Sequence, residues 1–408
     1  MQSRLPLIFI VITLALDAMG IGLILPVMPD LIAQINGGSV GQAAVWGGLL
    51  STAFAVMQFV FGPVVGALSD RFGRRPVLLT SLFVMCLDYL MMAVAGSIWL
   101  LFVTRIIGGI TAATYSTASA FIADVTPQDK KSAAFGLVGA AFGVGFVFGP
   151  AIGGLLAEFG TRAPFYAAAA LAGANLIFGY FVVPETVTDR IRRRFEWRRA
   201  NPVGALLKLS ELPGVTRLLV LFFIYEFAFI VYPSVWAYYT TAQFGWAPGR
   251  IGLSLALFGV GIAIVQGALI RPALRRYGER LTIIYGICFN FSAFVVLALV
   301  TNGWVALGFI PLTALGAVVT PALQGLMSKS AADNQQGELQ GVISSAKSLA
   351  TMIAPLAMTQ IFFAFTGPGA VFFPGAPFVL SAVLMVVCLS VFLARPHQAA
   401  KSDAQGRF

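Results

Sequence analysis

Five charged side chains lie inside stretches of the sequence that are otherwise apolar: Asp17, Asp88, Arg105, Glu226 and Lys347. A charge inside a bilayer is costly, so such residues are rare there and usually serve the movement of protons or substrate. At about 1.5 Å per residue, Asp17 and Arg105 lie at similar depth in a hydrocarbon core of about 30 Å. We predict that they form an ion pair whose carboxylate binds and releases a proton as its access to water changes. A purely structural pair is the alternative.

Glu226 and Lys347 form a second set of opposite charges near mid-depth. An unpaired charge there would be strongly destabilising, so we predict that the two side chains come within salt-bridge range, directly or through water. One interpretation is a compensating salt bridge. The other makes Glu226 a second proton or cation site.

The composition indicates a membrane scaffold for these charges. The 408 residues are 59% hydrophobic and only 10% charged, which excludes a soluble globular protein. A helix needs roughly 20 apolar residues to cross a bilayer. Twelve apolar runs meet this need, at 5–30, 43–65, 77–95, 98–122, 133–157, 163–183, 214–240, 250–270, 281–300, 303–327, 338–366 and 374–394. We predict an all-α integral membrane protein with these runs as its transmembrane helices.

The loops between the runs give the orientation. Basic residues gather in every second connection, including six arginines between positions 190 and 199, whereas the alternate connections hold only Arg162 and Arg250. Positive charge is retained on the cytoplasmic side, so we predict that both termini are cytoplasmic. The net charge of +10 is then a topology signal and calls for no nucleic-acid partner. The first run is long and carries Asp17, so we expect a retained helix and not a cleaved signal peptide.

The chain repeats itself after 205 residues. Glycines and prolines coincide at that offset: Gly47 with Gly252, Gly62 with Gly267, Gly73 with Gly278, Gly136 with Gly341, and Pro150 with Pro355. Two pseudo-symmetric six-helix halves are typical of secondary transporters, which bind substrate near mid-membrane between the halves. We predict an N-terminal bundle at 1–183, a cytoplasmic linker at 184–213, a C-terminal bundle at 214–394 and a cytoplasmic tail at 395–408.

A short stretch that begins at position 66 and reads GALSDRFGRRPVL combines glycines with four charges. It resembles the signature between the second and third helices of the major facilitator superfamily. The resemblance implies the major facilitator fold, an Asp70 that docks on the start of the eleventh helix, and an ion pair between Arg74 and Asp124. We call this predicted conformational cluster the latch; its members are Gly66, Asp70, Arg71, Gly73, Arg74, Arg75 and Asp124. A basic loop that only sets topology is the alternative.

The second copy of this stretch, at 271–280, keeps Gly278 but carries Arg275 where the first has Asp70. We therefore predict that the latch is present in one half only.

The run 133–157 carries closely spaced small residues: Gly139, Gly143, Gly145, Gly149, Pro150, Gly153 and Gly154. Glycines four residues apart leave one helix face bare for a neighbouring helix, and proline adds a kink point. Packing is the ordinary explanation, but the pattern also resembles the antiporter motif of drug/proton exchangers in the superfamily. The stretch 104–109 resembles the helix 4 motif of the family, whose arginine, here Arg105, is linked to proton coupling.

The segments 16–23, 87–90 and 321–325 resemble the bacterial tetracycline/proton antiporters, and the similarity spans nearly the whole chain. Asp17, Asp88 and Arg105 match polar positions of that family, and we assign proton coupling to them together with Glu226 and Lys347.

The chain departs from that family at two positions tied to transport. Ile262 and Asn290 stand where the family can carry a histidine and an aspartate. The exact substrate therefore stays open. Amides and aromatic rings offer a mostly apolar pocket that suits a planar, drug-sized ligand. We predict that it is lined by Gln58, Tyr232, Trp236, Phe258, Gln266, Asn290 and Gln324.

These observations favour proton-coupled efflux of a drug-sized molecule, a tetracycline-like antibiotic or another multidrug substrate, across the bacterial inner membrane. A proton-coupled symporter or importer of a small metabolite is the alternative. An ATP-driven exporter would need a G-x-x-x-x-G-K-[ST] loop, which does not occur, and an enzyme would need a cluster of catalytic groups. Cys86, Cys288 and Cys388 are too scattered for a metal site. We expect a monomer with no cofactor, driven by the proton gradient; a divalent cation chelated by the substrate stays open.

Overall fold

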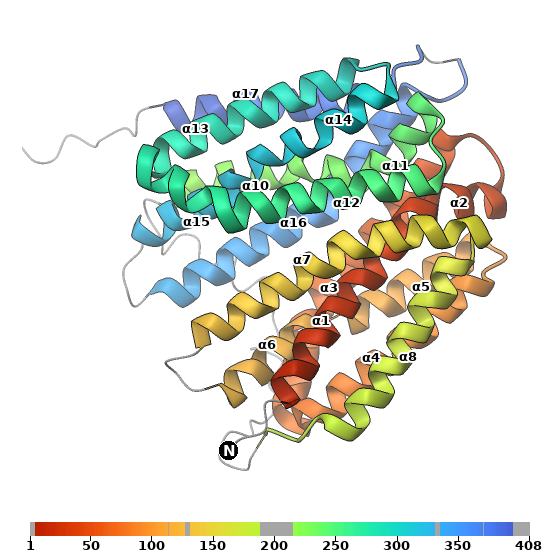
Figure 1. Cartoon of the computed structure of the whole chain (residues 1–408), viewed down its shortest axis with the longest axis vertical. Helices are drawn as coiled ribbons and strands as arrows, with labels where there is room; N and C mark the ends of the chain where they lie inside the picture. Colours follow the sequence, from red (N-terminus) through yellow and green to blue (C-terminus); the bar gives the residue numbers. More distant parts are fainter. Residues whose placement is uncertain are drawn as a thin grey trace, which may run out of the picture.

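The computed structural model describes residues 5–112, 114–126, 131–187, 215–330, 335–369 and 371–394. Every regular element within these ranges is a helix, as predicted. Figure 1 shows two groups of helices, one from each half of the chain. The N-terminal bundle contains α1 (Leu5–Ile24), α2 (Met28–Asn36), α3 (Val40–Phe72), α4 (Arg74–Val94), α5 (Ile98–Thr111), α6 (Thr114–Val125), α7 (Lys131–Leu156) and α8 (Ala163–Val182). The C-terminal bundle contains α10 (Thr216–Phe229), α11 (Val231–Phe244), α12 (Pro248–Ile264), α13 (Ile270–Leu299), α14 (Gly303–Thr313), α15 (Val319–Ser330), α16 (Gln336–Ala364) and α17 (Ala376–Leu393).

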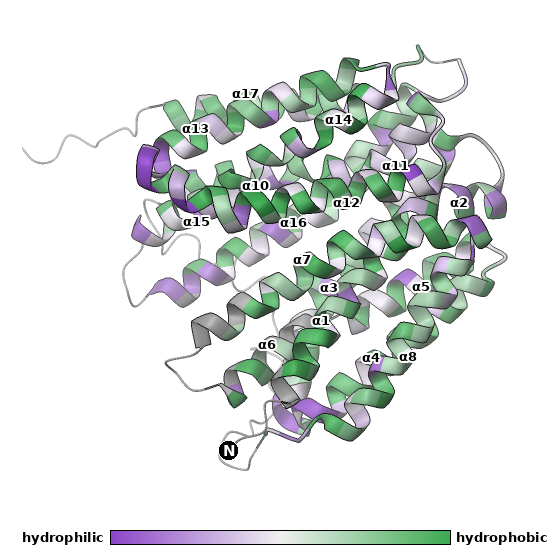
Figure 2. Cartoon of the chain, in the orientation of Figure 1, coloured by the Kyte–Doolittle hydropathy of each residue, from purple (hydrophilic) through white to green (hydrophobic). Residues whose placement is uncertain are grey.

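The helices match the predicted spans. Within the described residues, 10 helical segments are long and apolar enough to cross a membrane. One of them, Pro248–Leu299, contains two of the predicted spans, 250–270 and 281–300. The backbone turns between these spans at Gly278. The predicted span 98–122 is divided between α5 and α6. Figure 2 shows hydrophobic residues along the helices and hydrophilic residues gathered at many helix ends.

Besides the span 98–122, three further predicted helices are interrupted within the described residues, so they are not continuous α-helices. The run 5–30 breaks at a 3₁₀ turn, Leu25–Val27, between α1 and α2, next to Pro26 and Pro29. The run 214–240 breaks at Ile230 between α10 and α11, because Pro233 has no N–H to donate to the carbonyl of Phe229. The run 303–327 passes through a 3₁₀ turn, Ala314–Val318.

The internal repeat is visible in backbone conformation. Gly73 and Gly278, which are 205 residues apart in the sequence, both take positive φ angles, of 112° and 69°. Only glycine adopts such angles without strain, so the backbone can turn sharply into the next helix at both positions. We call the end of the molecule that carries these two turns the basic end.

Close glycine contacts join the two bundles in two equivalent places. α12 packs on α7, where a Cβ on Gly252 would lie 2.2 Å from the carbonyl oxygen of Pro150. α3 packs on α16, where a Cβ on Gly48 would lie 3.0 Å from the carbonyl oxygen of Pro355. Pro150 and Pro355 are again 205 residues apart. The bundle boundaries stay a prediction, since most of the predicted linker and the tail 395–408 lie outside the described residues.

Candidate functional site

The buried arginine of the N-terminal bundle pairs with a different acid from the one predicted. Arg105 on α5 lies 2.5 Å from Asp88 on α4, and the side chains are 11% and 3% exposed. The guanidinium also lies over the ring of Phe54, 5.4 Å from its centroid. The predicted pair of Asp17 with Arg105 is absent among the described residues. The reason is helix adjacency: a short turn joins α4 to α5, whereas α1 packs mainly on α7 and α8.

Asp17 on α1 is left with an unused polar atom. Its Oδ1 is buried and has no hydrogen-bond partner in the described part of the chain. The bundle therefore holds both an ion pair of Arg105 with Asp88 and a carboxyl group, that of Asp17, which forms no ion pair with any described arginine or lysine.

The glycine motif of α7 explains how α1 is held. A Cβ on Gly145, Gly149 or Gly153 would collide with the backbone of α1, at 2.2, 2.6 and 2.1 Å from its carbonyl oxygens. A Cβ on Gly154 would lie 2.7 Å from the carbonyl oxygen of Pro248 in the other bundle. By contrast, a Cβ on Gly139 would meet nothing within 4 Å, as would one on Gly143. The motif therefore sets α7 between α1 and α12.

The two extra charges of the C-terminal bundle do come together, as predicted. Lys347 Nζ on α16 lies 3.9 Å from Glu226 Oε2 on α10. The other carboxylate oxygen of Glu226 accepts a hydrogen bond of 2.8 Å from the hydroxyl of Thr320 on α15. The Glu226 side chain is 9% exposed and that of Lys347 is 61% exposed. Thr320 was not predicted, and nothing in its sequence environment distinguishes it.

Asn290, which we predicted to line the substrate pocket, is engaged in helix packing in this structure. It is fully buried, and its Nδ2 donates to Tyr225 Oη at 2.9 Å and to the carbonyl of Gly316 at 3.3 Å. A side chain on Gly316 would overlap the Asn290 amide. Asn290 therefore holds α13 against α10 and the 3₁₀ turn of the broken tenth span.

Tyr232 and Trp236 do border a cavity, with residues of the other bundle. The cavity measures about 50 Å³ and lies among α3, α11, α12 and the break after α1, with Gly47 and Ser51 on its far side. Phe258 packs against Tyr232, with ring centroids 4.8 Å apart and ring planes inclined by 34°. The predicted glutamines lie elsewhere: Gln58 and Gln266 are exposed and Gln324 is half-buried. The structure thus gathers the aromatic members of the predicted pocket and not its amides.

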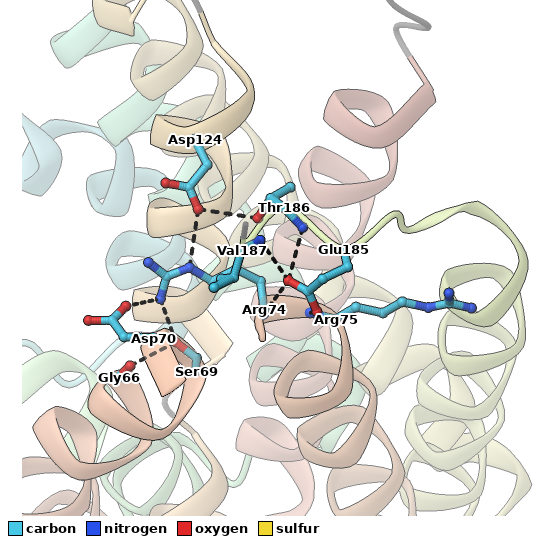
Figure 3. Close-up of polar contacts among 9 residues, drawn as sticks. All are labelled: Gly66, Ser69, Asp70, Arg74, Arg75, Asp124, Glu185, Thr186 and Val187. Atoms are coloured by element: carbon cyan, nitrogen blue, oxygen red, sulfur yellow. Dashed lines mark hydrogen bonds and ion pairs between the residues drawn. The ribbon is translucent and has the colours of Figure 1, made fainter. Parts of the chain in front are cut away.

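Figure 3 shows the latch, in which Arg74 binds two acids. Arg74 forms an ion pair with Asp70 in the preceding turn, and its Nε lies 3.2 Å from Asp124 Oδ2 on α6. Its Nη1 also donates to Ser69 Oγ at 2.6 Å, and Ser69 Oγ donates to the carbonyl of Gly66 at 2.8 Å. The predicted pair of Arg74 with Asp124 is therefore present. The docking of Asp70 on the start of α16 stays a prediction.

The latch also contains an acid that sequence reasoning missed. Both carboxylate oxygens of Glu185, just after α8, accept N–H bonds at the start of α4, from Arg74 at 2.9 Å and Arg75 at 3.3 Å (Figure 3). A Cβ on Gly73 would lie 2.1 Å from this carboxylate and would be strained at the φ angle of 112°, so glycine suits this position. Thr186 donates to Asp124 at 3.2 Å. The remaining members, Arg71 and Arg75, lie beside the rings of Phe72 and Tyr180.

The second copy of the turn holds a matching ion pair. Glu279, directly after Gly278, lies 2.6 Å from Lys329 at the end of α15. These positions correspond to Arg74 and Asp124 at the 205-residue offset.

Comparison with known proteins identifies the class. The chain belongs to the Major Facilitator Superfamily, whose family model matches residues 10–355 and 218–407. It is 41% identical over 390 residues to the tetracycline resistance protein, class C, of Escherichia coli, covering 95% of this chain and 96% of that protein. It is 37% identical over 394 residues to the class G protein of Vibrio anguillarum, covering 95% and 97%. Multidrug resistance protein 2 of Bacillus subtilis is 30% identical over 351 residues, covering 83% and 84%.

Solved structures share the fold. The human organic anion transporter MFSD10 superposes with a TM-score of 0.68 at 24% identity, covering 96% of this chain and 100% of that one. A bacterial homologue of the human lysosomal transporter Spinster superposes with a TM-score of 0.77 at 15% identity, covering 96% and 97%. The predicted superfamily and its 12-helix fold are thereby confirmed.

Proposed function

We propose that the protein exports drug-sized organic molecules across the bacterial inner membrane in exchange for protons, by alternating access. The near full-length similarity to tetracycline and multidrug resistance proteins supports this class of activity. One observation in the structure carries the proton part: Asp17 on α1 has a buried oxygen with no hydrogen-bond partner among the described residues.

The coupling step follows from the different surroundings of Asp88 and Asp17. Asp88 lies 2.5 Å from Arg105, whose positive charge offsets a negative charge on this carboxylate. Asp17 has no such partner, so a buried negative charge on it is costly unless water or a proton reaches it. If Asp17 takes up a proton from one side of the membrane and releases that proton to the other, the change in its charge would bias how α1 moves against α7.

Several further properties belong to the same proposal. The arginine-rich basic end is placed in the cytoplasm, with both termini, because positive loops are retained there. We propose a monomer without a cofactor, in which the proton gradient supplies the energy and a divalent cation enters only if the substrate chelates one. The superfamily consists of transporters, which supports a role other than that of an enzyme.

The test is uptake of tetracycline into inverted membrane vesicles with an imposed pH gradient, acidic inside. We expect uptake that nigericin abolishes, and we expect Asp17→Asn to abolish it without loss of folded protein, because the variant cannot bind and release a proton at this position. Full gradient-driven uptake by Asp17→Asn would overturn the assigned role of Asp17. Accumulation in right-side-out vesicles instead would support the proton-coupled importer.

A further inference from the structure

We propose that Lys347 is a binding site for the acid group of an anionic or zwitterionic organic substrate, an inference that rests on the proposed export function and specifies the substrate class. The relevant contrast is within one ion pair. Glu226 is the covered member and Lys347 is the accessible member, with side chains 9% and 61% exposed. A ligand that approaches this pair therefore meets the ammonium group first.

Within the described part of the chain, the ammonium group of Lys347 keeps N–H donors that no hydrogen bond uses. Its nitrogen is 3.9 Å from Glu226 Oε2, beyond ordinary hydrogen-bond length. The other carboxylate oxygen is engaged by Thr320 at 2.8 Å. A lysine carries three N–H donors and no acceptor, so the group can hold a carboxylate or enolate while Glu226 balances the charge in its absence.

The exposed side of Lys347 faces water and not lipid. Lys347, Met358 and Phe362 share one stripe of α16, since spacings of 11 and 15 residues return to the same face of a helix. Met358 and Phe362 are fully buried, so this stripe is covered by protein in the half of α16 away from the basic end.

Toward the basic end the same side of α16 becomes open and polar, with Gln340 and Ser344 exposed beside Lys347. A lipid-facing stripe would be apolar, and an ammonium group at this depth is tolerated only where water reaches it. The stripe is therefore a polar path that leads from the basic end to Lys347.

The experiment measures binding to the purified full-length protein with two fluorescent three-ring probes, anthracene-9-carboxylate and its uncharged amide. We expect wild-type protein to bind the acid about tenfold more tightly than the amide, as one charge-assisted contact allows. Lys347→Met should reduce the preference to near unity, and Lys347→Arg should keep it. Glu226→Gln should increase the preference, because it removes the competing carboxylate.

Folding is controlled with the double variant Glu226→Gln/Lys347→Met, which leaves no stranded charge and should also lack the preference. An equal preference in wild type and Lys347→Met would overturn the proposal, as would wild-type protein without a preference. Selective binding of ethidium that Glu226→Gln abolishes would also overturn it, in favour of a cation site. Binding needs no gradient, so failure of pH-driven uptake with an intact acid preference would count against the export function and not against this site.

Discussion

The two bundles build the same turn with opposite charges. In the N-terminal bundle, Arg74 after Gly73 binds Asp124; in the C-terminal bundle, Glu279 after Gly278 binds Lys329. The repeated fold therefore fixes the positions of the two paired residues. Which of the two carries the positive charge is not fixed, because the pair only ties a turn to the end of a neighbouring helix.

The sign of the charge is not free three residues before the glycine. Asp70 in one turn corresponds to Arg275 in the other at the 205-residue offset. A helix start carries partial positive charge, so an acid can dock on it and an arginine cannot. This difference is why we assign the latch to the N-terminal turn alone.

The two turns also differ in how firmly they are held. The side chains of Arg74 and Asp124 are 12% and 21% exposed, and Glu185 and Thr186 add further hydrogen bonds. Lys329 is 71% exposed. The following predictions test whether the N-terminal turn depends on its particular charges more than the C-terminal turn does.

The largest effect is expected from Arg74→Glu. The variant places an acid among Asp70, Asp124 and Glu185 and removes the cation that binds the first two, so we expect a loss of stability of about 3 kcal/mol and loss of transport. Thermal unfolding in detergent and gradient-driven tetracycline uptake would measure both. Stability and uptake like those of wild type would show that the latch contributes nothing to the free energy of unfolding or to transport.

Copying the C-terminal turn sharpens this prediction. The triple variant Asp70→Arg/Arg74→Glu/Asp124→Lys reproduces the charges of Arg275, Glu279 and Lys329. We expect it to unfold at a higher temperature than Arg74→Glu because the ion pair is restored, and still to transport poorly because no acid remains at position 70. Recovery of full transport would refute the special role of Asp70.

Asp70→Asn isolates that role. Arg74 keeps Asp124 as a partner, so the protein should fold, but the attraction to the start of α16 is weakened. We expect the state that is closed at the basic end to be less populated. Single cysteines on α7 and α16 near that end should then react faster with a water-soluble maleimide, and unchanged labelling would rule out the docking.

Much of this architecture could be predicted from the sequence, because apolar runs and the 205-residue offset are local or periodic signals. The partner of Arg105 could not, since depth along a helix does not say which helix is adjacent. Asp88 is the partner because α4 and α5 form a hairpin. Glu185 was missed for a related reason: its contact with the start of α4 spans more than a hundred residues and has no sequence pattern.

Removal of Glu185 should have a moderate effect. Glu185→Ala leaves the first N–H groups of α4 without their acceptor and removes a negative charge from a helix start, which costs about 1 kcal/mol. Ser390→Ala is a matched control, because Ser390 stands at the repeated position and only bonds back to Val386 in its own helix. We expect thermal unfolding to shift for Glu185→Ala and to stay near wild type for Ser390→Ala. Equal shifts would show that the carboxylate does not hold the turn.

The smallest effect is expected from Lys329→Ala, although its distance to Glu279, 2.6 Å, is shorter than the 3.2 Å between Arg74 and Asp124. Distance is a poor guide here, because Lys329 is 71% exposed and water screens the attraction. Exposed pairs contribute about 0.2–1 kcal/mol, and salt weakens them further. We therefore expect a small shift of the unfolding temperature at low ionic strength that vanishes in about 1 M salt, with uptake unchanged. The shift caused by Arg74→Glu should persist in the same salt, since its carboxylates are partly buried. A salt-resistant loss of stability or transport in Lys329→Ala would mean that the C-terminal turn is held as firmly as the N-terminal one, and that the sign-inverted copy is a second latch.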